Sequence, residues 1–484
     1  MDQSINSTPT RPKTIHVICI GGSGLRILRS FIMLLSSGYD IPGYRVKPYI
    51  VDPHLQSEDL KRATELITWY QEIYSPDNAG FFRVPLEIEN INKLNAMEAD
   101  SEPNRSFGDF IGYQQISSRS DSKAVIDILY NGINITKSMS VGFKGSPNVG
   151  SVVFKDFVQG TWFQNHLTHL SNDDRVIVIG SLFGGTGASG IPAIAKALKT
   201  RSPQLKIAAI ALTPYFKLHK PDPNATDKEI DSETFEAKSL AALNFYSNND
   251  FGIDSFYVIG DSECDNYYQY DEASQGNLAH FIEMVAATAI KEFAGTPEAS
   301  MQPWNMFFTA DLQSTMLYDH CGPGLKEVSE SLANFYAFSK FIHLMRNDLW
   351  YPFNKRFYHT VIKSPKTADR MRALDRLIYS EDPAMDSFIR WMGEMRDNTR
   401  SFNAVNTEDI LSPDGQIQTY RFAPQTPNPV FNGTEKLSRT NMSDYFLAIN
   451  DIYRQTLKKP ESIDSVAKFL NICHRGIIKV NSKE

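Results

Sequence analysis

Apolar residues along this chain alternate between short continuous runs and longer stretches with a helical period. The continuous runs are rich in Val and Ile, which is typical of strands buried on both faces of a parallel sheet. They occupy residues 14–20, 46–51, 175–180, 207–212 and 255–260. The helical periods lie at 25–36, 57–74, 191–198, 233–247 and 278–293. This alternation predicts the α/β class, with a doubly wound, mostly parallel sheet and a long central helix.

Three glycine-bearing turns interrupt this pattern. Gly21-Gly-Ser-Gly24 follows the first strand, and Ser140-Val-Gly-Phe-Lys-Gly-Ser-Pro-Asn-Val-Gly150 precedes a helical stretch at 151–170. Phe183-Gly-Gly-Thr-Gly-Ala-Ser189 follows the run at 175–180. Glycine lets a backbone approach a ligand closely, and the N–H groups at a helix start favour an anion. Because ligands gather at the carboxyl edge of a parallel sheet, we expect the turns to form one phosphate site. The alternative explanation for any one of these turns is that its glycines serve only to pack a tight turn between a strand and a helix.

The turns do not match two common nucleotide motifs. None ends in Gly-Lys-[Ser/Thr], which excludes a P-loop. A dinucleotide fingerprint can be fitted to Gly185, Gly187 and Gly190, but it comes far into the chain rather than after the first strand. Asp52, after the second strand, either holds a ribose or caps the turn that follows it. An NAD-dependent oxidoreductase therefore stays a third hypothesis.

Composition narrows the classes of partner and compartment. The 484 residues carry a formal net charge of −7 without a clear basic patch, so we expect no nucleic-acid partner. No apolar run reaches the length of a membrane span and no signal-peptide layout is present, which predicts a cytoplasmic protein. The four cysteines are scattered and are expected to be reduced. His166 and His169 lie three apart on a helix, but solvated or core histidines are the commoner case, and no ligand spacing predicts a structural metal.

The pattern changes beyond residue 317. Helices are expected at 328–349 and 364–397, and short terminal helices at 442–457 and 462–473. An aromatic stripe in the first of these, at Phe335, Tyr336, Phe338 and Phe341, indicates either core or a partner surface. Polar segments at 95–123 and 403–440 predict a surface excursion and an exposed linker, respectively.

The order of the turns resembles that of the tubulin and FtsZ superfamily, and divergent bacterial tubulin-like proteins fit better than FtsZ or tubulin themselves. The family signature Gly-Gly-Gly-Thr-Gly-[Ser/Thr]-Gly is similar to Phe183-Gly-Gly-Thr-Gly-Ala-Ser189, and Pro192-Ala-Ile-Ala195 continues it as in FtsZ. Phe183 replaces the first glycine, and Ala188 stands at the hydroxyl position. The resemblance covers about residues 14–316.

The resemblance implies a site for GTP or GDP, with Mg²⁺ held through the phosphates. The implied phosphate contacts are Gly21, Gly22, Ser23, Gly24, Gly145, Ser146, Pro147, Asn148, Gly184, Gly185, Thr186, Gly187 and Ala188. The implied sugar and base contacts are the loop at 213–216 together with Asp261, Asn277, His280 and Phe281. Asp52 is a further candidate contact, from its place after the second strand. Leu25 replaces an asparagine that reads the base in FtsZ, so base preference stays open.

Hydrolysis is implied through a loop that a neighbouring subunit inserts. Phe307–Met316 resembles that loop and places Asp311 at its last acid, whereas Met306 and Phe308 stand at its other polar positions. Asp311 is the expected catalytic residue, Glu283 or Asp319 could assist, and a helix cap is the alternative role of Asp311. The first hypothesis is therefore a self-assembling GTP-binding protein with slow hydrolysis. The second is a GTP-regulated, non-polymerising scaffold that recruits a protein partner through its C-terminal helices.

These expectations divide the chain into six parts. They are a flexible arm (1–13), a nucleotide-binding α/β domain (14–276), a central helix (277–296), a helical second domain (297–402), a linker (403–440) and a C-terminal helical segment (441–484).

Overall fold

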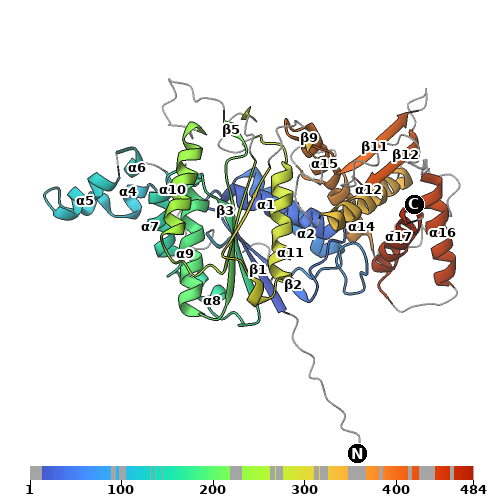
Figure 1. The fold of residues 1–484 in the computed structure, drawn as a ribbon, viewed down its shortest axis with the longest axis horizontal. Helices are drawn as coiled ribbons and strands as arrows, with labels where there is room; N and C mark the ends of the chain where they lie inside the picture. Colours follow the sequence, from blue (N-terminus) through green and yellow to red (C-terminus); the bar gives the residue numbers. More distant parts are fainter. Residues whose placement is uncertain are drawn as a thin grey trace, which may run out of the picture.

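The computed structural model describes most of the chain (Figure 1). The described residues are 13–88, 94–97, 105–130, 132–136, 138–143, 145–218, 232–261, 267–268, 276–309, 315–316, 325–346, 367–380, 385–411, 417–424, 442–457 and 463–482. No helix in this part of the chain is both long and apolar enough to cross a membrane.

A six-stranded sheet, parallel throughout, forms the centre of the molecule. Its strands are β1 (Lys13–Ile20), β2 (Tyr44–Val51), β3 (Arg175–Ser181), β4 (Lys206–Leu212), β6 (Ser255–Gly260) and β8 (Trp304–Phe308). They lie in the order β2-β1-β3-β4-β6-β8. The order reverses between β1 and β3, and in such sheets the loops after those two strands open a crevice. The α/β class and the doubly wound topology are confirmed.

Helices cover both faces of this sheet (Figure 1). One layer contains α1 (Gly21–Ser36), α2 (Glu58–Ile73) and α11 (Phe281–Gly295), and the other contains α7 (Pro147–Phe157), α8 (Thr161–Leu167), α9 (Gly185–Arg201) and α10 (Phe235–Ser247). Alternate strand residues serve the two layers: Val17 and Ile177 belong to one apolar cluster, and Ile18 and Val178 to the other. Two-sided burial explains why the strands read as continuous apolar runs.

Helices α1, α7, α9 and α11 begin at residues other than those expected, and α1 and α7 each begin four residues early, at Gly21 and Pro147. α9 begins at Gly185 rather than at 191, so Pro192 lies inside the helix. Proline has no N–H, and the Ala188 carbonyl four residues earlier instead accepts a hydrogen bond from the Tyr246 hydroxyl at 2.6 Å. α11 begins at Phe281 rather than at 278, and His280 is its N-cap. The predicted start at 191 would place Pro192 in the first helical turn, where no donor is missing; inside the helix, Tyr246 supplies the donor instead.

Strand β8 replaces part of a predicted loop. Residues 306–308 were expected in the loop after the central helix, but they pair in parallel with β6, with Met306 opposite Val258. The prediction is wrong there because the parallel crossover from β6 through α11 returns the chain to the sheet edge. Exposed and half-buried side chains alternate along this strand, as an edge position allows.

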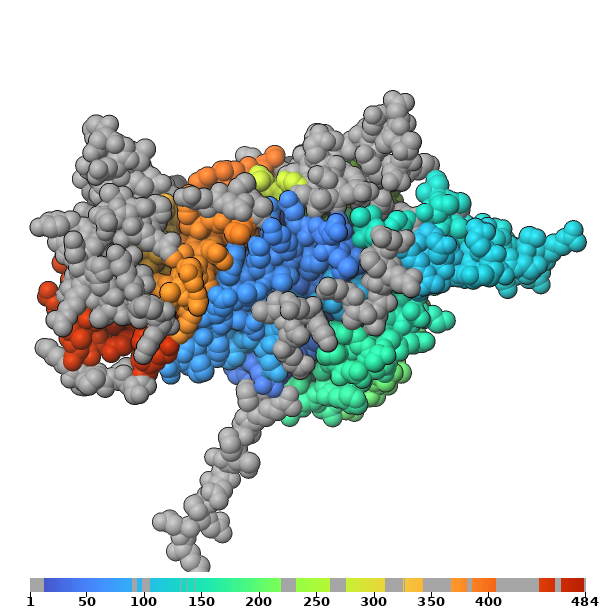
Figure 2. Space-filling model, turned by 180° about the vertical axis from the view of Figure 1, so that it is seen from behind, coloured from blue at the N-terminus to red at the C-terminus, as the bar shows by residue number. Residues whose placement is uncertain are grey.

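An arm projects from the body of the molecule, as Figures 1 and 2 show. It is built from α4 (Phe107–Phe110), η2 (Tyr113–Gln115), α5 (Asp121–Leu129) and α6 (Gly132–Thr136), and α5 has no buried residue. The predicted surface excursion, 95–123, is wrong at its first residues, because residues 95–97 are buried. The Asn95 side chain accepts a hydrogen bond from the Asp52 N–H and donates one to the Asp52 carbonyl.

The C-terminal region is mainly helical. Its helices are α12 (Lys326–Arg346), α14 (Ala368–Ile378), α15 (Phe388–Asp397), α16 (Met442–Leu457) and α17 (Ser465–Asn481). Phe335, Phe338 and Phe341 of α12 are fully buried, so these members of the aromatic stripe form core rather than a partner surface. The same apolar cluster includes the α1 and α11 side of the sheet.

Strands outside the central sheet complete the described elements. They are β5 (Lys217–Leu218), β7 (Tyr267–Tyr268), β9 (Thr315–Met316), β10 (Ser401–Phe402), β11 (Val405–Leu411) and β12 (Ile417–Pro424), with η3 (Ser232–Thr234) and η4 (Glu298–Ser300). β11 and β12 pair antiparallel within the segment that was expected to be a linker. Threonines, tyrosine and aromatic residues along these strands explain the hairpin, which the polar composition of 403–440 concealed.

Candidate functional site

A cavity of about 310 Å³ opens where β1 and β3 end, at the reversal of strand order. Its lining combines glycine turns, charged side chains and an aromatic wall. The lining residues are Ile20, Gly21, Gly22, Ser23, Arg26, Asp52, His54, Ser57, Glu58, Asp59, Arg62, Val141, Gly142, Phe143, Gly145, Ser181, Phe183, Gly184, Gly185, Thr186, Gly187, Phe216, Phe235, Gly276, Asn277, Leu278 and Glu394.

The three glycine turns converge around Thr186. Gly21 has φ +65° and Gly142 has φ +80°, and Cβ atoms built on them would lie 3.3 Å from the Thr186 Cβ and 3.4 Å from its Oγ1. A Cβ on Gly185 would lie 2.9 Å from both the Phe143 Cβ and the Ser146 nitrogen. Side chains at these positions would push the turns apart, so glycine permits their close approach.

Two helices begin at the cavity, and no side chain caps the N–H groups of their first turns. α1 follows Ile20 and α9 follows Gly184, and neither residue has a polar side chain that could accept from the first turn. Neither of these fully described helices has an acidic residue in its first turn. Their positive dipole ends and free N–H groups therefore favour an anion.

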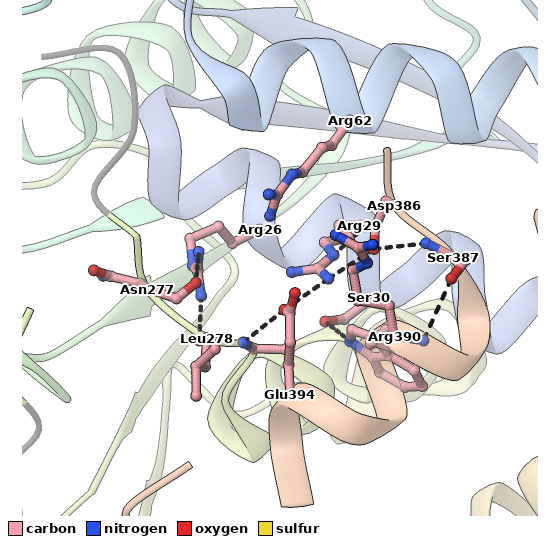
Figure 3. Close-up of polar contacts among 12 residues, drawn as sticks. Arg26, Arg29, Ser30, Arg62, Asn277, Leu278, Asp386, Ser387, Arg390 and Glu394 are labelled. Atoms are coloured by element: carbon pink, nitrogen blue, oxygen red, sulfur yellow. Dashed lines mark hydrogen bonds and ion pairs between the residues drawn. The ribbon is translucent and has the colours of Figure 1, made fainter. Parts of the chain in front are cut away.

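Arg26 connects helix α1 to the segment before α11 (Figure 3). Its guanidinium donates to Glu283 at 2.6 Å and to the backbone carbonyls of Asn277 and Leu278 at 3.2 and 2.6 Å. Asp59 lies 3.7 Å from the same group. These contacts hold Asn277 and Leu278 at the cavity wall.

Asp52 places a buried carboxylate at the cavity. Its Oδ1 accepts the His54 N–H at 2.9 Å. Burial raises the pKa of Asp52 to about 7, although that hydrogen bond acts in the opposite direction. The carboxylate therefore titrates near neutral pH.

Aromatic rings form another wall of the cavity. The Phe183 ring centroid lies 4.8 Å from that of Phe235 and 5.6 Å from that of Phe216. This cluster explains why phenylalanine replaces the first glycine of the turn: its ring is buried among the others. An apolar wall of this kind suits the face of a planar ligand.

The structure brings ten of the expected site residues to one cavity. The ten that were named singly are Gly21, Gly22, Ser23, Asp52, Gly145, Gly184, Gly185, Thr186, Gly187 and Asn277, and Phe216 of the expected 213–216 loop lines the same cavity. Gly24 instead lies against the backbone of β1 and β3, Ser146, Pro147 and Asn148 stand at the start of α7, and Ala188 is inside α9. Lys144, Asp311 and Asp319 fall outside the described residues.

Four expected residues lie elsewhere. Arg400 binds Asp261 through two nitrogen–oxygen contacts of 2.8 Å. His280 caps α11 by accepting the Ile282 N–H, and burial lowers the pKa of its imidazole to about 3. Phe281 is in the core, and the fully buried Glu283 accepts from Arg26 and Tyr215. The structure places none of the four on the cavity lining.

Sequence reasoning missed Arg26, Arg62 and Glu394. Arg26 and Arg29 lie three apart in the otherwise apolar stretch 25–36, a signal that they face one direction and need buried acidic partners. Glu394 comes from α15, 365 residues from Arg29, and no local pattern marks it.

Comparisons with known proteins give matches to solved structures alone. No family model and no curated protein matches the chain. It is similar to CetZ from Methanosaeta thermophila strain DSM 6194 (TM-score 0.28, 14% identity, 52% of this chain and 46% of that one). It is also similar to CetZ2 from Haloferax volcanii, solved as a GTPγS-bound protofilament (TM-score 0.25, 13% identity, 51% of this chain and 49% of that one). A third is TubZ of Clostridium botulinum phage c-st, truncated at its C-terminal tail (TM-score 0.25, 14% identity, 60% of this chain and 67% of that one). The chain spans about half the length of the two CetZ chains.

Proposed function

We propose that the cavity binds GTP and that the chain is a nucleotide-binding protein of the divergent bacterial tubulin-like kind. The observation that carries the proposal is the convergence of three glycine turns and two uncapped helix N-termini around Thr186. Such a cradle of backbone N–H groups suits a chain of phosphates. The cavity volume of about 310 Å³ lies at the lower end of small-molecule sites.

The lining fits the Mg²⁺ that accompanies a nucleoside triphosphate. Mg²⁺ prefers oxygen donors and is usually held by phosphates with one or two carboxylates. Thr186 and Asp59 supply such oxygens, and an Asp59 oxygen lies 3.5 Å from the position of a Cβ on Gly22. The ion would offset phosphate charge, and Arg26 would hold the base end of the cavity in place.

Self-assembly with slow hydrolysis is the finer part of the proposal. It rests on the resemblance at residues 307–316, which assigns Asp311 to the phosphates of a neighbouring subunit. Met306 and Phe308 lie in β8, so the other two polar positions of that loop are occupied by strand residues. This observation favours the second candidate, a GTP-regulated scaffold without efficient turnover.

Two substitutions of similar size that differ in charge test nucleotide binding. Gly22 lines the cavity, and a Cβ there meets only an ordinary contact of 3.5 Å, so a side chain is tolerated. Gly22→Asp should reduce the affinity for fluorescent GTP at least about tenfold through repulsion of the phosphates, whereas Gly22→Asn keeps the size without the charge. Mass spectrometry of co-purified nucleotide identifies the natural ligand. Equal affinity of the two variants would contradict a phosphate site here.

Two measurements distinguish the self-assembling GTPase from the scaffold. Phosphate release and sedimentation are followed together, with GTP and Mg²⁺, over a range of protein concentrations. Turnover per subunit that rises with concentration and is lost in Asp311→Ala supports catalysis across an assembly contact. Tight binding with flat, negligible turnover and no pellet supports the scaffold.

A further inference from the structure

Glu394 reaches the cavity from the C-terminal helix α15 (Figure 3). Its Oε2 accepts hydrogen bonds from Arg29 Nη2 at 2.8 Å and from the Ala279 N–H at 3.1 Å. These two bonds fix the carboxylate between helix α1 and the segment that precedes α11. A cavity side chain is therefore supplied by an element far from the glycine turns in sequence.

The charge of Glu394 is not needed to neutralise Arg29. Asp386 already binds Arg29 through both carboxylate oxygens, at Nε and, at 2.7 Å, at Nη2. Within the described part of the chain, Glu394 Oε1 accepts no hydrogen bond, and the side chain remains 14% exposed. Oε1 is therefore available to a ligand.

The neighbouring Asn277 has a second uncommitted group. The residue is only 7% exposed and lines the same cavity, and its Oδ1 has no hydrogen-bond partner. A buried polar atom without a partner is costly unless a ligand satisfies it. Glu394 contacts the segment that contains Asn277, because it accepts a hydrogen bond from the N–H of Ala279, two residues after Asn277.

These groups lie away from the anion-binding turns. Arg29, which positions Glu394, is seven residues beyond Gly22 on α1, or about 10 Å of helix rise. A carboxylate would repel phosphates, whereas it would attract the N–H donors of a base. Asp59 also lies near Gly22, where it can hold Mg²⁺, so the helix N-termini rather than net charge define a phosphate end at Gly22 and Thr186, and the acceptors of Glu394 and Asn277 define a base end.

We propose that Glu394 selects guanine by accepting hydrogen bonds from its N1–H and 2-amino group. This inference rests on the proposed nucleotide function and adds its base specificity. Adenine presents an acceptor at N1, and xanthine presents a carbonyl in place of the 2-amino group, so both would face the carboxylate with an unpaired acceptor. Hypoxanthine keeps the N1–H and loses the 2-amino group, so it is intermediate.

The ionisation state of Glu394 agrees with this role. Burial alone would raise its pKa, but the charge and hydrogen bond of Arg29 hold the pKa below the usual value. The group is then an acceptor only at neutral pH.

Glu394→Gln tests the inference. The amide oxygen can keep accepting from Arg29 and Ala279, which turns the NH₂ toward the cavity and replaces an acceptor with a donor. Affinity for GTP should fall roughly 10- to 100-fold, while affinity for XTP should rise and that for ATP should not fall. Titrations with GTP, ITP, XTP and ATP measure the four affinities, and thermal melting checks that the variant is folded.

Glu58→Gln is the matched control, because it removes the same charge from the same cavity on helix α2 and should shift all four affinities alike. The wild-type order GTP, ITP, XTP provides a measurement that needs no variant. A Glu394→Gln loss that is equal for all bases, or wild-type ITP binding as well as GTP, would overturn this inference alone. No binding of any nucleotide by the wild type would instead overturn the proposed function.

Discussion

At the scale of single residues, the cavity is set by a few buried charges. Arg26 and Arg29 are nearly inaccessible, and each is matched by a buried carboxylate, Glu283 and Asp386 respectively. Such charges would be prohibitively costly without their partners. Asp52 differs, because no cation pairs with it in the contacts described and its burial appears as a raised pKa.

Asp52 makes stability depend on pH. Its pKa rises from an ordinary value of 3.8 to about 7 in the folded chain, so the folded state binds the proton more tightly. The resulting stabilisation is complete below about pH 4 and is lost as pH rises through about 7. Asp52→Asn, which can still accept the His54 N–H, should flatten this dependence and be more stable than the wild type at pH 8, by up to about 4 kcal/mol.

Urea unfolding at pH 5 and pH 8 measures the effect of Asp52→Asn. The exposed Asp173→Asn controls for the change in overall charge. A difference between Asp52→Asn and the wild type that is the same at both pH values would contradict the raised pKa.

At the scale of elements, helix α9 accommodates a proline at its centre because another helix supplies the missing donor. The Tyr246 hydroxyl of α10 occupies the position that the residue 192 N–H would take, at the Ala188 carbonyl. This contact joins two helices of one layer directly behind the glycine turn that starts α9. The geometry of that turn therefore depends on α10.

Removing this donor should destabilise α9. Tyr246→Phe keeps the ring and leaves the buried Ala188 carbonyl unpaired, which should lower the free energy of unfolding by about 1–3 kcal/mol. Pro192→Ala restores the N–H to that carbonyl, so in its background Tyr246→Phe should cost much less. Denaturant unfolding of the two single variants and the double variant measures the coupling. Strictly additive costs would show that the hydroxyl acts through other contacts.

At the scale of the whole molecule, the C-terminal region forms part of the wall of the cavity at the carboxyl edge of the sheet. α14 lies on α2, α15 contributes Glu394, and Trp391 of α15 donates to Ser30 of α1 at 3.2 Å. The principal apolar cluster runs from the sheet through α12 to α17. The buried Arg29–Asp386 pair holds this junction together.

Breaking that pair should be far more costly than breaking a surface pair. Asp386→Ala removes the buried carboxylate that binds Arg29 through both oxygens and leaves the partly exposed Glu394 as its acidic partner, which should reduce the free energy of unfolding by about 3 kcal/mol. Glu327→Gln, which breaks a half-exposed contact with Lys291, should cost less than about 1 kcal/mol. Urea unfolding compares the two. Similar small costs would mean that the junction is held by apolar contacts alone.

Local pattern determined much of this protein. Five sheet strands, their parallel class and the glycine turns follow from continuous apolar runs and from residues whose preferences act within a few positions, and ten expected site residues do meet at one cavity. Local pattern did not predict the positions of Asp261 and His280, which lie off the cavity. Asp261 binds Arg400, and His280 caps helix α11.

Tertiary structure alone decided the rest. β8 is a short strand whose identity depends on a free sheet edge beside β6, and Glu394 enters the cavity through contacts with Arg29 and Ala279. Sequence spacing carries information about neighbours along a helix or strand, whereas these placements depend on which surfaces meet after the chain has folded. Local sequence therefore determined the glycine turns of the cavity, and long-range packing placed Glu394 on its wall.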